Sequence, residues 1–289
     1  MEWVKAHIFK FLFEKNLYFA FCIQHSAFEH LLDQFQFRIQ PGVRSMAQFR
    51  IKIAGHTTEV TSLFDSTRDY CRNYLTEDSP ELYIPVSRED LAREQVELDA
   101  EALREGLRRR VFTEPFLERT VIQKKLAEHL LSRDILLLHG SAVAVDSQGY
   151  LFMAKCGTGK STHTRLWRQA FGERAVMVND DKPFVEIAAS GAVLHGAPWS
   201  GKHGLDTNLA VPLKGICLLQ RGTENRIWRI PAEDAVPMLW ESCQMPEDGQ
   251  NSHVQKLVRA LAANTALYRM TCTKDPQAAV VSYETMSGV

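Results

Sequence analysis

The sequence predicts an α/β (α+β) protein in which helices flank β-strands, preceded by a small α/β unit. Apolar runs of strand length recur from residue 135 onward, and helical patterns of ten or more residues follow among them. The runs at 142–145 and 150–154 are separated only by the turn sequence of residues 146–149. A connection this short joins antiparallel strands, because parallel strands need a long crossover.

The chain of 289 residues divides into three predicted parts. We expect residues 1–45 to be an N-terminal extension, because Met46 opens a strand-like stretch after the breaker Gln40-Pro41-Gly42. The extension is aromatic, but its longest stretch without formal charge, residues 16–28, is too short to span a membrane. Residues 46–110 are predicted to form a small α/β unit with a helical connector, and residues 111–289 the main domain.

The small unit and the segment after it contain recognisable strand and helix signals. Strands are predicted at 47–53 and 82–86. Ser87, three residues before Asp90, is a start signal for a charged helix that extends to residue 110. A second helix, expected to dock on the main domain, ends before Arg133-Asp134. Its apolar residues share one stripe: Phe116, Val121, Leu126, Leu130 and Leu131.

The main domain begins with strands at 135–138, 142–145 and 150–154, and the third strand runs into a glycine-rich loop. A helix at 162–171 ends at Gly172, and the strand "RAVMVNDD" follows and ends in two acids. The elements expected after it are strands at 183–187, 192–195, 214–219 and 225–230, helices near 231–242 and 252–263, a strand in "ALYRMTCT" and a helix from residue 275.

Composition limits the classes of partner. Lys and Arg total 34 and Asp and Glu total 35, so the formal net charge is −1. Such a chain lacks the broad positive field of proteins that bind nucleic acid or anionic membranes, and we expect small molecules or proteins as partners. Six cysteines without a C-x-x-C pair, in a chain with 45% hydrophobic residues, predict free thiols and a cytoplasmic location.

The loop "CGTGKST" after the third strand is typical of a phosphate site. A strand, a glycine-rich loop and a helix place consecutive backbone N–H groups around phosphate oxygens at the positive end of the helix. Gly157 and Gly159 allow close approach, Lys160 would reach the outer phosphates, and the Ser161 hydroxyl would bind Mg²⁺. The residues predicted to bind nucleotide here are Cys156, Gly157, Thr158, Gly159, Lys160, Ser161 and Thr162.

Two positions of this loop leave alternatives open. Ala154 stands where the motif has its first glycine, and it fits if its φ is negative. Cys156, beside a helix N-terminus and Lys160, is either a reactive thiol or a small loop residue. The alternative for the loop as a whole is a glycine turn with an incidental lysine.

The adjacent acids Asp180 and Asp181 end the strand that follows the loop and its helix. Side chains of neighbouring residues on a strand point to opposite sides, which suits two different roles. One acid can bind Mg²⁺ and the other can take a proton from an attacking hydroxyl, as phosphoryl transfer requires. The alternative is that they only end the strand or cap a turn before Pro183.

These segments resemble the catalytic domain of HPr kinase/phosphorylase, whose fold is shared with ATP-dependent phosphoenolpyruvate carboxykinases. "LLHGSAVAVDSQGYLFMAKCGTGKST" is similar to the family's L-H-G segment, hairpin and G-x-G-K-S loop, and "VMVNDD" to its L-V-x-D-D segment. The resemblance covers about residues 115–289. It implies a mixed, largely antiparallel sheet with flanking helices around a P-loop core.

The resemblance also implies residue roles. His139 would assist transfer beside the phosphates, although a histidine at a strand end can equally be structural. Lys160 would stabilise the transferring phosphoryl group, Ser161 and Asp180 would bind the metal, and Asp181 would be the general base. ATP and Mg²⁺ are the implied cofactors.

The chain departs from the family downstream of the acids. The family's second signature, "RGxG", is absent, and "GAPWSGKHGLDTN" stands in its place, which disfavours HPr as the substrate. Within it, Lys202 or His203 could supply charge to phosphate from a loop that closes, or the loop could be an ordinary exposed hairpin. Glu186 is a weaker candidate for a metal shell and could be an ordinary strand carboxylate.

The sequence thus predicts an ATP-dependent kinase that transfers the γ-phosphoryl group to a serine-type hydroxyl of a peptide, protein or small molecule. The acceptor stays open. Carboxykinase chemistry is disfavoured because it needs a larger site. The alternative from another class is an ATP-binding sensor or peptide-maturation protein without phosphotransfer. Homo-oligomers are expected, as among the apparent relatives.

Overall fold

The computed structural model describes residues 47–104, 106, 108–188, 191–246 and 251–288. The predicted extension, residues 1–45, lies outside the described residues. Within those ranges, every helix is too short or too polar to cross a membrane. Five cysteines of the described residues are free thiols, as predicted.

The N-terminal unit is a three-stranded sheet in the order β1 (Ala47–Ile53), β2 (His56–Ser62), β3 (Leu82–Pro85). β1 and β2 are antiparallel and β2 and β3 are parallel. A helix, α3 (Asp65–Tyr70), and a short 3-10 helix, η2 (Arg72–Tyr74), connect β2 to β3. β2 and α3 are absent from the sequence prediction because "HTTEVTS" is polar and α3 is only one and a half turns long.

The two predicted helices form α4 (Arg88–Arg104) and α5 (Glu114–Leu131). The amide of Ser87 donates to Asp90 Oδ2 at 2.9 Å and the amide of Asp90 donates to Ser87 Oγ at 3.2 Å, so the start signal is confirmed. α4 ends before the predicted residue 110, since Gly106 adopts a positive φ of 69°. Phe116 was expected on the buried stripe of α5, but it is 42% exposed and stacks on Phe112.

The main domain has a nine-stranded sheet whose strands are β4 (Ile135–Leu137), β5 (Ser141–Val145), β6 (Gln148–Met153), β7 (Ala175–Asn179), β8 (Phe184–Ala188), β9 (Gly191–His195), β10 (Ala210–Arg221), β11 (Arg226–Arg229) and β12 (Ala266–Cys272). The long strand β10 joins its two halves. Its first residues pair antiparallel with β9, and its later residues pair parallel with β6 and β12. The other pairings in this sheet are antiparallel, so the predicted mixed, largely antiparallel sheet is confirmed.

The predicted hairpin of β5 and β6 is confirmed, but its turn is shorter than the expected 146–149. Val145 pairs with Gln148, leaving Asp146 and Ser147 at the turn with φ of 50° and 62°. Two positive φ values are typical of the two-residue hairpin turn whose twist matches that of the strands. Gly149 lies inside β6, where a Cβ would come within 3.0 Å of the side chains of Leu194 and Val211.

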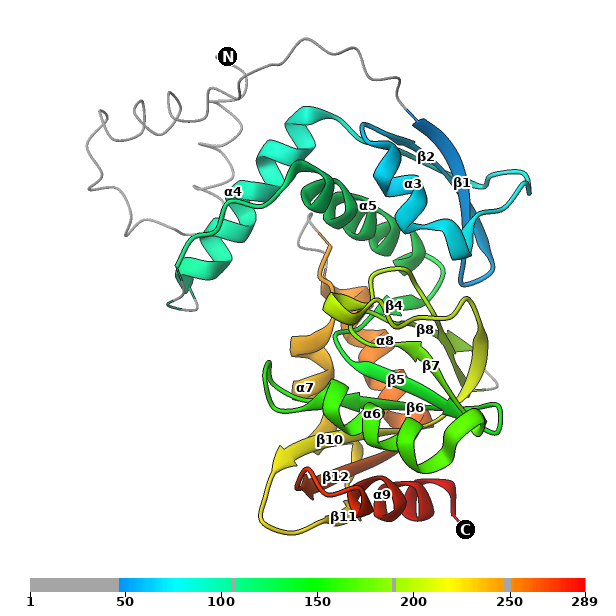
Figure 1. The fold of residues 1–289 in the computed structure, drawn as a ribbon, viewed down its shortest axis with the longest axis vertical. Helices are drawn as coiled ribbons and strands as arrows, with labels where there is room; N and C mark the ends of the chain where they lie inside the picture. Colours follow the sequence, from blue (N-terminus) through cyan, green and yellow to red (C-terminus); the bar gives the residue numbers. More distant parts are fainter. Residues whose placement is uncertain (1–46, 105, 107, 189–190, 247–250, 289) are drawn as a thin grey trace. The chain divides into compact units, whose positions relative to one another are not determined.

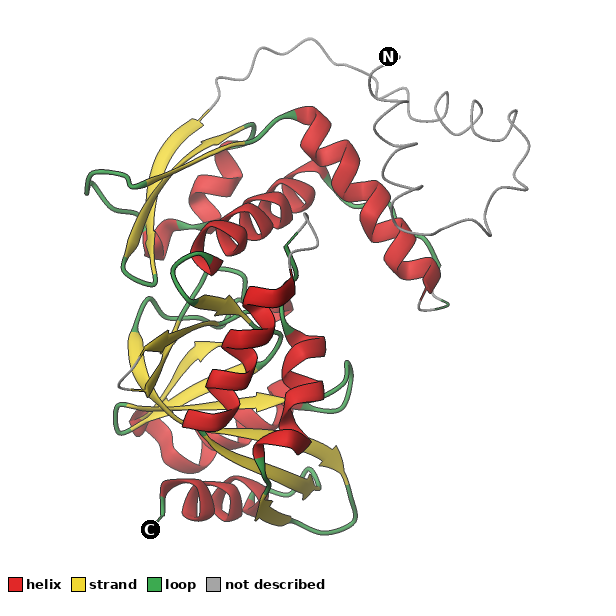
Figure 2. Ribbon diagram, turned by 180° about the vertical axis from the view of Figure 1, so that it is seen from behind, coloured by secondary structure: helices red, strands yellow, loops and turns green. Residues whose placement is uncertain are grey.

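Strand alternation in the hairpin directs apolar side chains into two cores. Val143 and Phe152 face one core with α6 (Lys160–Phe171) and α9 (Gln277–Ser287), while Ala142 and Leu151 face the other. The helices α7 (Ala232–Ser242) and α8 (Asn251–Asn264) cover that second core. Figure 1 shows α6 and α9 in front of the strands, and Figure 2 shows the face that α7 and α8 cover. Covered on both faces, the end of β6 is a rigid base for the loop that follows.

Candidate functional site

The glycine-rich loop leaves the buried end of β6 and enters α6 at Lys160. Gly157 and Gly159 adopt φ of 73° and 126°, in the left-handed region where glycine is strongly preferred. Ala154 is 5% exposed and is not among the residues with positive φ, so alanine fits the first position of the motif. Cys156 is exposed on the loop.

The first amides of α6 are free to bind an anion. Among the described residues, the N–H groups of Gly159, Lys160, Ser161 and Thr162 have no hydrogen-bond acceptor, and the first helical bond runs from His163 N to Gly159 O at 2.9 Å. Such groups carry the positive end of the helix dipole. α6 therefore presents the backbone donors that the sequence predicts for phosphate oxygens.

Lys160 folds back over the loop. Its ammonium donates to Ala154 O at 3.0 Å, and the residue is only 8% exposed. Within the described residues, no carboxylate lies within ion-pair distance of this ammonium. Burial lowers the pKa of Lys160, and the nearby Cys156 and Asp181 oppose that shift. A buried cation without an ion pair favours a bound anion.

Asp180 is tied to the first turns of α6 through two hydroxyls. Ser141 Oγ donates to Asp180 Oδ1 at 2.6 Å and lies 2.8 Å from Thr164 Oγ1. All three residues are buried. Ser141 and Thr164 were not predicted from the sequence. Ser141 could have been, because its hydroxyl directly follows the L-H-G segment. This chain of contacts holds the end of β7 beside the phosphate loop's helix.

Asp181 points toward His139. His139 Nε2 lies 3.3 Å from Asp181 Oδ1, and the two side chains are 36% and 35% exposed. The amide of Gly140 donates to the backbone carbonyl of Asp181 at 3.0 Å, which fixes the two segments together. The structure therefore brings together two residues that lie about 40 positions apart in the sequence and were both predicted for the site.

The charges around this pair set its protonation. Burial, with the ammonium groups of Lys182 and Lys160, lowers the pKa of His139 to about 3. The imidazole is therefore neutral near pH 7, and its contact with Asp181 is that of a neutral ring rather than an ion pair. Burial raises the pKa of Asp181, against the effect of both lysines.

Two basic residues near the site escaped the sequence prediction. Lys182 follows the acids directly, and burial lowers the pKa of its ammonium. Arg221, at the end of β10, donates from Nη2 to Gly157 O at 2.5 Å and from Nε to Thr158 O at 3.4 Å. Lys182 could have been found from its position next to the acids. Arg221 could not, because 64 residues separate it from its partner in the loop.

The segment "WSGKHG" lies beside Asp181. A Cβ added to Gly201 would stand 3.3 Å from Asp181 Cβ, so the backbone packs closely on that side chain. Lys202 and His203 are exposed in a short 3-10 helix, η4 (Gly201–His203), and neither makes a side-chain hydrogen bond or ion pair within the described ranges. The role of Lys202 as a phosphate ligand remains a prediction.

Glu186 has a structural partner. Its Oε2 lies 3.1 Å from Nε2 of His195 on the neighbouring strand β9. Burial lowers the pKa of His195, with Glu186 opposing the shift. The pairing between strands accounts for this carboxylate without a metal.

The donors near α6 fit Mg²⁺. Mg²⁺ typically takes one or two carboxylates and completes its shell with phosphate oxygens and water. Asp180 Oδ2 has no hydrogen-bond donor among the described residues, and Ser161 offers an exposed hydroxyl in the first turn of α6. The described part of the chain contains no group of three or more His, Cys, Asp or Glu side chains placed to hold a metal by themselves. These donors therefore suit a metal that arrives with phosphate.

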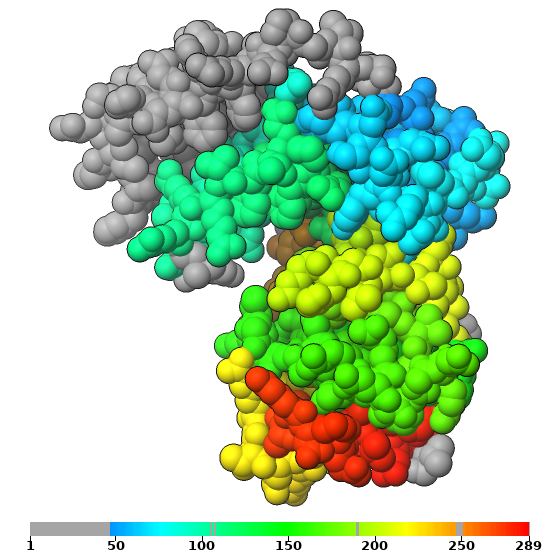
Figure 3. Space-filling model, viewed as in Figure 1, coloured from blue at the N-terminus to red at the C-terminus, as the bar shows by residue number. Residues whose placement is uncertain are grey.

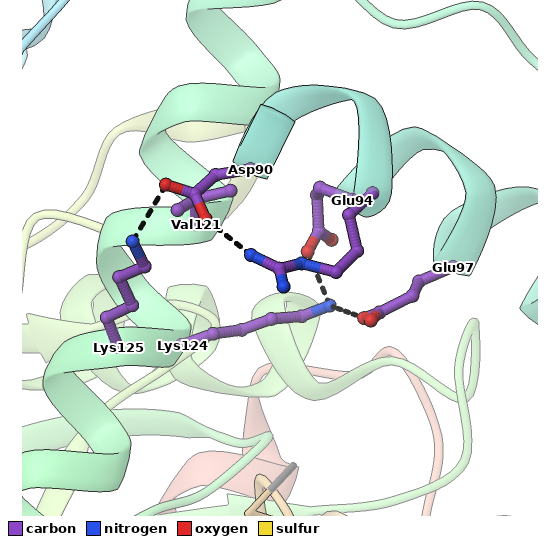
Figure 4. Close-up of a pocket in the computed structure, with 7 residues that line it drawn as sticks. Asp90, Glu94, Glu97, Val121, Lys124 and Lys125 are labelled. Carbon is purple, nitrogen blue, oxygen red and sulfur yellow. Dashed lines mark hydrogen bonds and ion pairs between the residues drawn. The ribbon is translucent and has the colours of Figure 1, made fainter. Parts of the chain in front are cut away.

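A pocket between α4 and α5 is filled by ion pairs. Lys124 Nζ lies 2.6 Å from Glu94 Oε2 and 2.9 Å from Glu97 Oε2, and Lys125 Nζ lies 2.8 Å from Asp90 Oδ2 (Figure 4). None of the predicted site residues lines this pocket. Its charged groups pair with one another, and we assign them to the packing of the two helices.

His163 lies on α6 just after the loop and is 1% exposed. Its ring is in edge contact with Phe152, and its Nε2 accepts from Trp167 Nε1 at 3.2 Å. Its Nε2 is 3.0 Å from Ser282 Oγ, and its Nδ1 has no partner within the described ranges. Burial lowers the pKa of this imidazole from 6.5 to about 4.

We expect the free energy of unfolding to fall as the pH is lowered from 6.5 to about 4, because the unfolded chain binds a proton at His163 in this window and the folded chain does not. The contribution of this group is at most about 3 kcal/mol. His163→Leu removes the titrating ring and leaves Trp167 Nε1 bonded to Ser282. Urea unfolding at a series of pH values measures the free energy of unfolding at each pH. Between pH 4 and 6.5 this free energy should change less with pH in the variant than in wild type. An equal pH dependence in the two proteins would contradict a lowered pKa of His163.

Comparison with solved structures shows a distant similarity. No family model matches the chain, and no curated protein matches it. A solved structure, the HPr(Ser) kinase/phosphatase from Coxiella burnetii, is similar with a TM-score of 0.32 and 9% identity, over 53% of this chain and 97% of that chain. The match is a distant structural similarity to the family that the sequence resembles. It carries no argument about the reaction of this chain.

Proposed function

We propose that this chain is an ATP-dependent kinase that transfers the γ-phosphoryl group of ATP to a serine-type hydroxyl of a small molecule, peptide or protein. One observation carries the proposal. The buried ammonium of Lys160, without an ion pair in the described part of the chain, lies at the free N-terminus of α6, with Asp181 and His139 nearby. This combination is suited to hold a phosphate chain and to activate a hydroxyl beside it.

In the proposed reaction, the free amides of residues 159–162 and the ammonium of Lys160 bind the phosphate oxygens. Lys160 exchanges its bond to Ala154 O for one to phosphate. Mg²⁺, held by Asp180 and Ser161, would neutralise charge on the phosphates. The acceptor hydroxyl gives its proton to the Asp181 carboxylate as its oxygen bonds to the γ-phosphorus, and the bond from that phosphorus to the bridging oxygen breaks to release ADP.

His139 acts next to the base. A neutral imidazole beside Asp181 can donate a hydrogen bond to its carboxylate and fix its orientation without neutralising it. The raised pKa of Asp181 makes this carboxylate a better proton acceptor than an exposed aspartate. Lys202 and His203, exposed beside Asp181, are our candidates for contacts to phosphate or to the acceptor.

Incubation with γ-labelled ATP, Mg²⁺ and a mixture of amino acids and serine-containing peptides tests the proposal. We expect label on an acceptor, and transfer at least about 100-fold slower in an Asp181→Asn variant. Binding of ATP without label on any hydroxyl would instead support the sensor alternative, to which Ala154 and the absent second signature give some weight.

MgATP is expected to protect Cys156 from alkylation. This thiol is exposed on the loop, whereas Cys71, Cys217 and Cys243 are buried. Iodoacetamide should modify Cys156 before the other four cysteines of the described residues, and saturating MgATP should slow that reaction by at least about tenfold if phosphates cover the loop. Peptide mass spectrometry measures the rate at each cysteine. An unchanged rate at Cys156 in saturating MgATP would mean that the nucleotide binds elsewhere.

A further inference from the structure

The segment of residues 197–208 between β9 and β10, which we call the clasped loop, is bonded at both ends to β7. Asn179 Nδ2 donates to Ala197 O at 2.6 Å and to Trp199 O at 3.3 Å. In the second half of the loop, Leu205 O accepts a hydrogen bond from the backbone amide of Asp180 at 3.1 Å. Asn179 Oδ1 also accepts hydrogen bonds from the backbone amides of Asp181 and Lys182. One buried amide side chain thus joins the acid-bearing turn to the loop.

Asp206 fastens the same loop to the N-terminal sheet unit. Its Oδ2 accepts from Ser200 Oγ at 2.6 Å, and its Oδ1 accepts from the hydroxyl of Tyr74 at 3.0 Å. Tyr74 is 1% exposed in η2, and Asn208 Nδ2 donates to Asn73 O at 3.2 Å next to it. In Figure 3 the yellow-green atoms of this region lie between the cyan N-terminal unit and the green main domain.

The clasped loop in turn packs on the candidate base. Gly201 follows Ser200 directly, with φ of 68°, and a Cβ at this position would stand 3.3 Å from Asp181 Cβ and 3.7 Å from Cγ. The gap between the loop backbone and Asp181 is therefore too narrow for a side chain at position 201. Release of the Ser200 hydroxyl from Asp206 frees the backbone that borders one side of the aspartate.

The chemistry of this cluster indicates a positioning role. Phenylalanine would fill the site of Tyr74 equally well, yet the chain buries a phenol there and aims its hydroxyl at a carboxylate more than a hundred residues away. Buried hydroxyl–carboxylate bonds are directional, and they fix one arrangement of the groups that they join. The arrangement fixed here is that of the loop against Asp181.

We propose that Asp206 is a positioning residue for Asp181, acting through Ser200 and the clasped loop, and that Tyr74 extends this control to the N-terminal sheet unit. The inference rests on the proposed function, since it assigns Asp181 the role of base. It adds that the N-terminal unit takes part in catalysis without touching ATP.

The first test is kinetic and uses Tyr74→Phe and Asp206→Asn, which keep the size of each side chain. We expect each to lower kcat by about 10- to 100-fold, the range that small misplacements of reacting groups produce, with KM for ATP unchanged. Tyr150→Phe is the matched control, because Tyr150 is equally buried and its hydroxyl has no hydrogen bond within the described ranges. Wild-type kcat in both test variants would overturn the proposal.

A double-mutant cycle then separates positioning from loss of structure. If Tyr74 acts through Asp181, Tyr74→Phe should lower kcat little further in a protein that already carries Asp181→Asn. If Tyr74→Phe lowers kcat by the same factor in wild type and in Asp181→Asn, Tyr74 does not act through Asp181.

A third measurement does not depend on the reaction. Hydrogen exchange of the amides in residues 200–206 should be at least about tenfold faster in Tyr74→Phe than in wild type, and unchanged in Tyr150→Phe. If the wild type transfers no phosphoryl group, the proposed function fails while this measurement still tests the clasp. Unchanged exchange in Tyr74→Phe would overturn the clasp itself.

Discussion

Replacement of Asp181 by asparagine is expected to lower kcat for phosphoryl transfer by about 10²- to 10⁴-fold, the usual contribution of a general base. The amide keeps the shape of the side chain and its packing against Gly201, but it cannot accept the hydroxyl proton. The free amides of α6 and Lys160 are unchanged, so the affinity for MgATP should stay near that of wild type. Initial rates at saturating ATP, with calorimetry for binding, measure the two quantities separately.

Asp146→Asn is the matched control for this variant. Asp146 is an exposed carboxylate at the opposite end of β5, paired with Arg174, and asparagine is well tolerated at its positive φ of 50°. An exposed ion pair contributes little to stability, so both activity and folding should be retained. A kcat in Asp181→Asn within a factor of about three of wild type would be too small a change for a general base and would remove Asp181 from that role.

The parts of this site that local sequence determines could be predicted. The β5–β6 hairpin, the loop and the start of α6 depend on turn residues, strand alternation and glycines within about thirty consecutive positions. The length of the hairpin turn was wrong because Gln148 and Gly149 have turn-like composition, while the ladder of β5 and β6 extends through them. Pairing with the neighbouring strands overrides the local preference there.

Contacts between distant segments could not be predicted. The bond from Tyr74 to Asp206 spans 132 residues, and neither residue belongs to a recognisable motif. The support of Asp180 by Ser141 depends on the strand order of the sheet, in which β5 lies between β6 and β7. A single sequence contains no information on that order beyond the hairpin. The sequence therefore predicts the residues that touch phosphate better than the residues that hold them in place.

Lys160→Met is expected to weaken MgATP binding by at least about 100-fold, because the variant loses a charge-assisted hydrogen bond from a buried ammonium. Removal of one group that stabilises the transferring charge should lower kcat by a further 10²- to 10³-fold, roughly the effect of losing one oxyanion donor. Calorimetric titration of MgATP and single-turnover transfer at high ATP would measure binding and chemistry. Lys155→Met is the matched control, since Lys155 is an exposed lysine of the same loop.

The same substitution should leave the folded protein as stable as wild type or more stable by about 1 kcal/mol, since it removes a desolvated charge and keeps the apolar stem. The pKa of Lys160 is lowered because burial disfavours the charged ammonium in the folded state. The resulting loss of folding stability is present in full below the folded pKa and disappears as the pH rises toward 10.5. Urea unfolding without nucleotide measures the difference. If Lys160 had only a structural role, Lys160→Met would instead be less stable than wild type and would bind MgATP with wild-type affinity. A more stable protein that no longer binds MgATP would mean that the chain accepts an unfavourable buried cation because phosphate pairs with it.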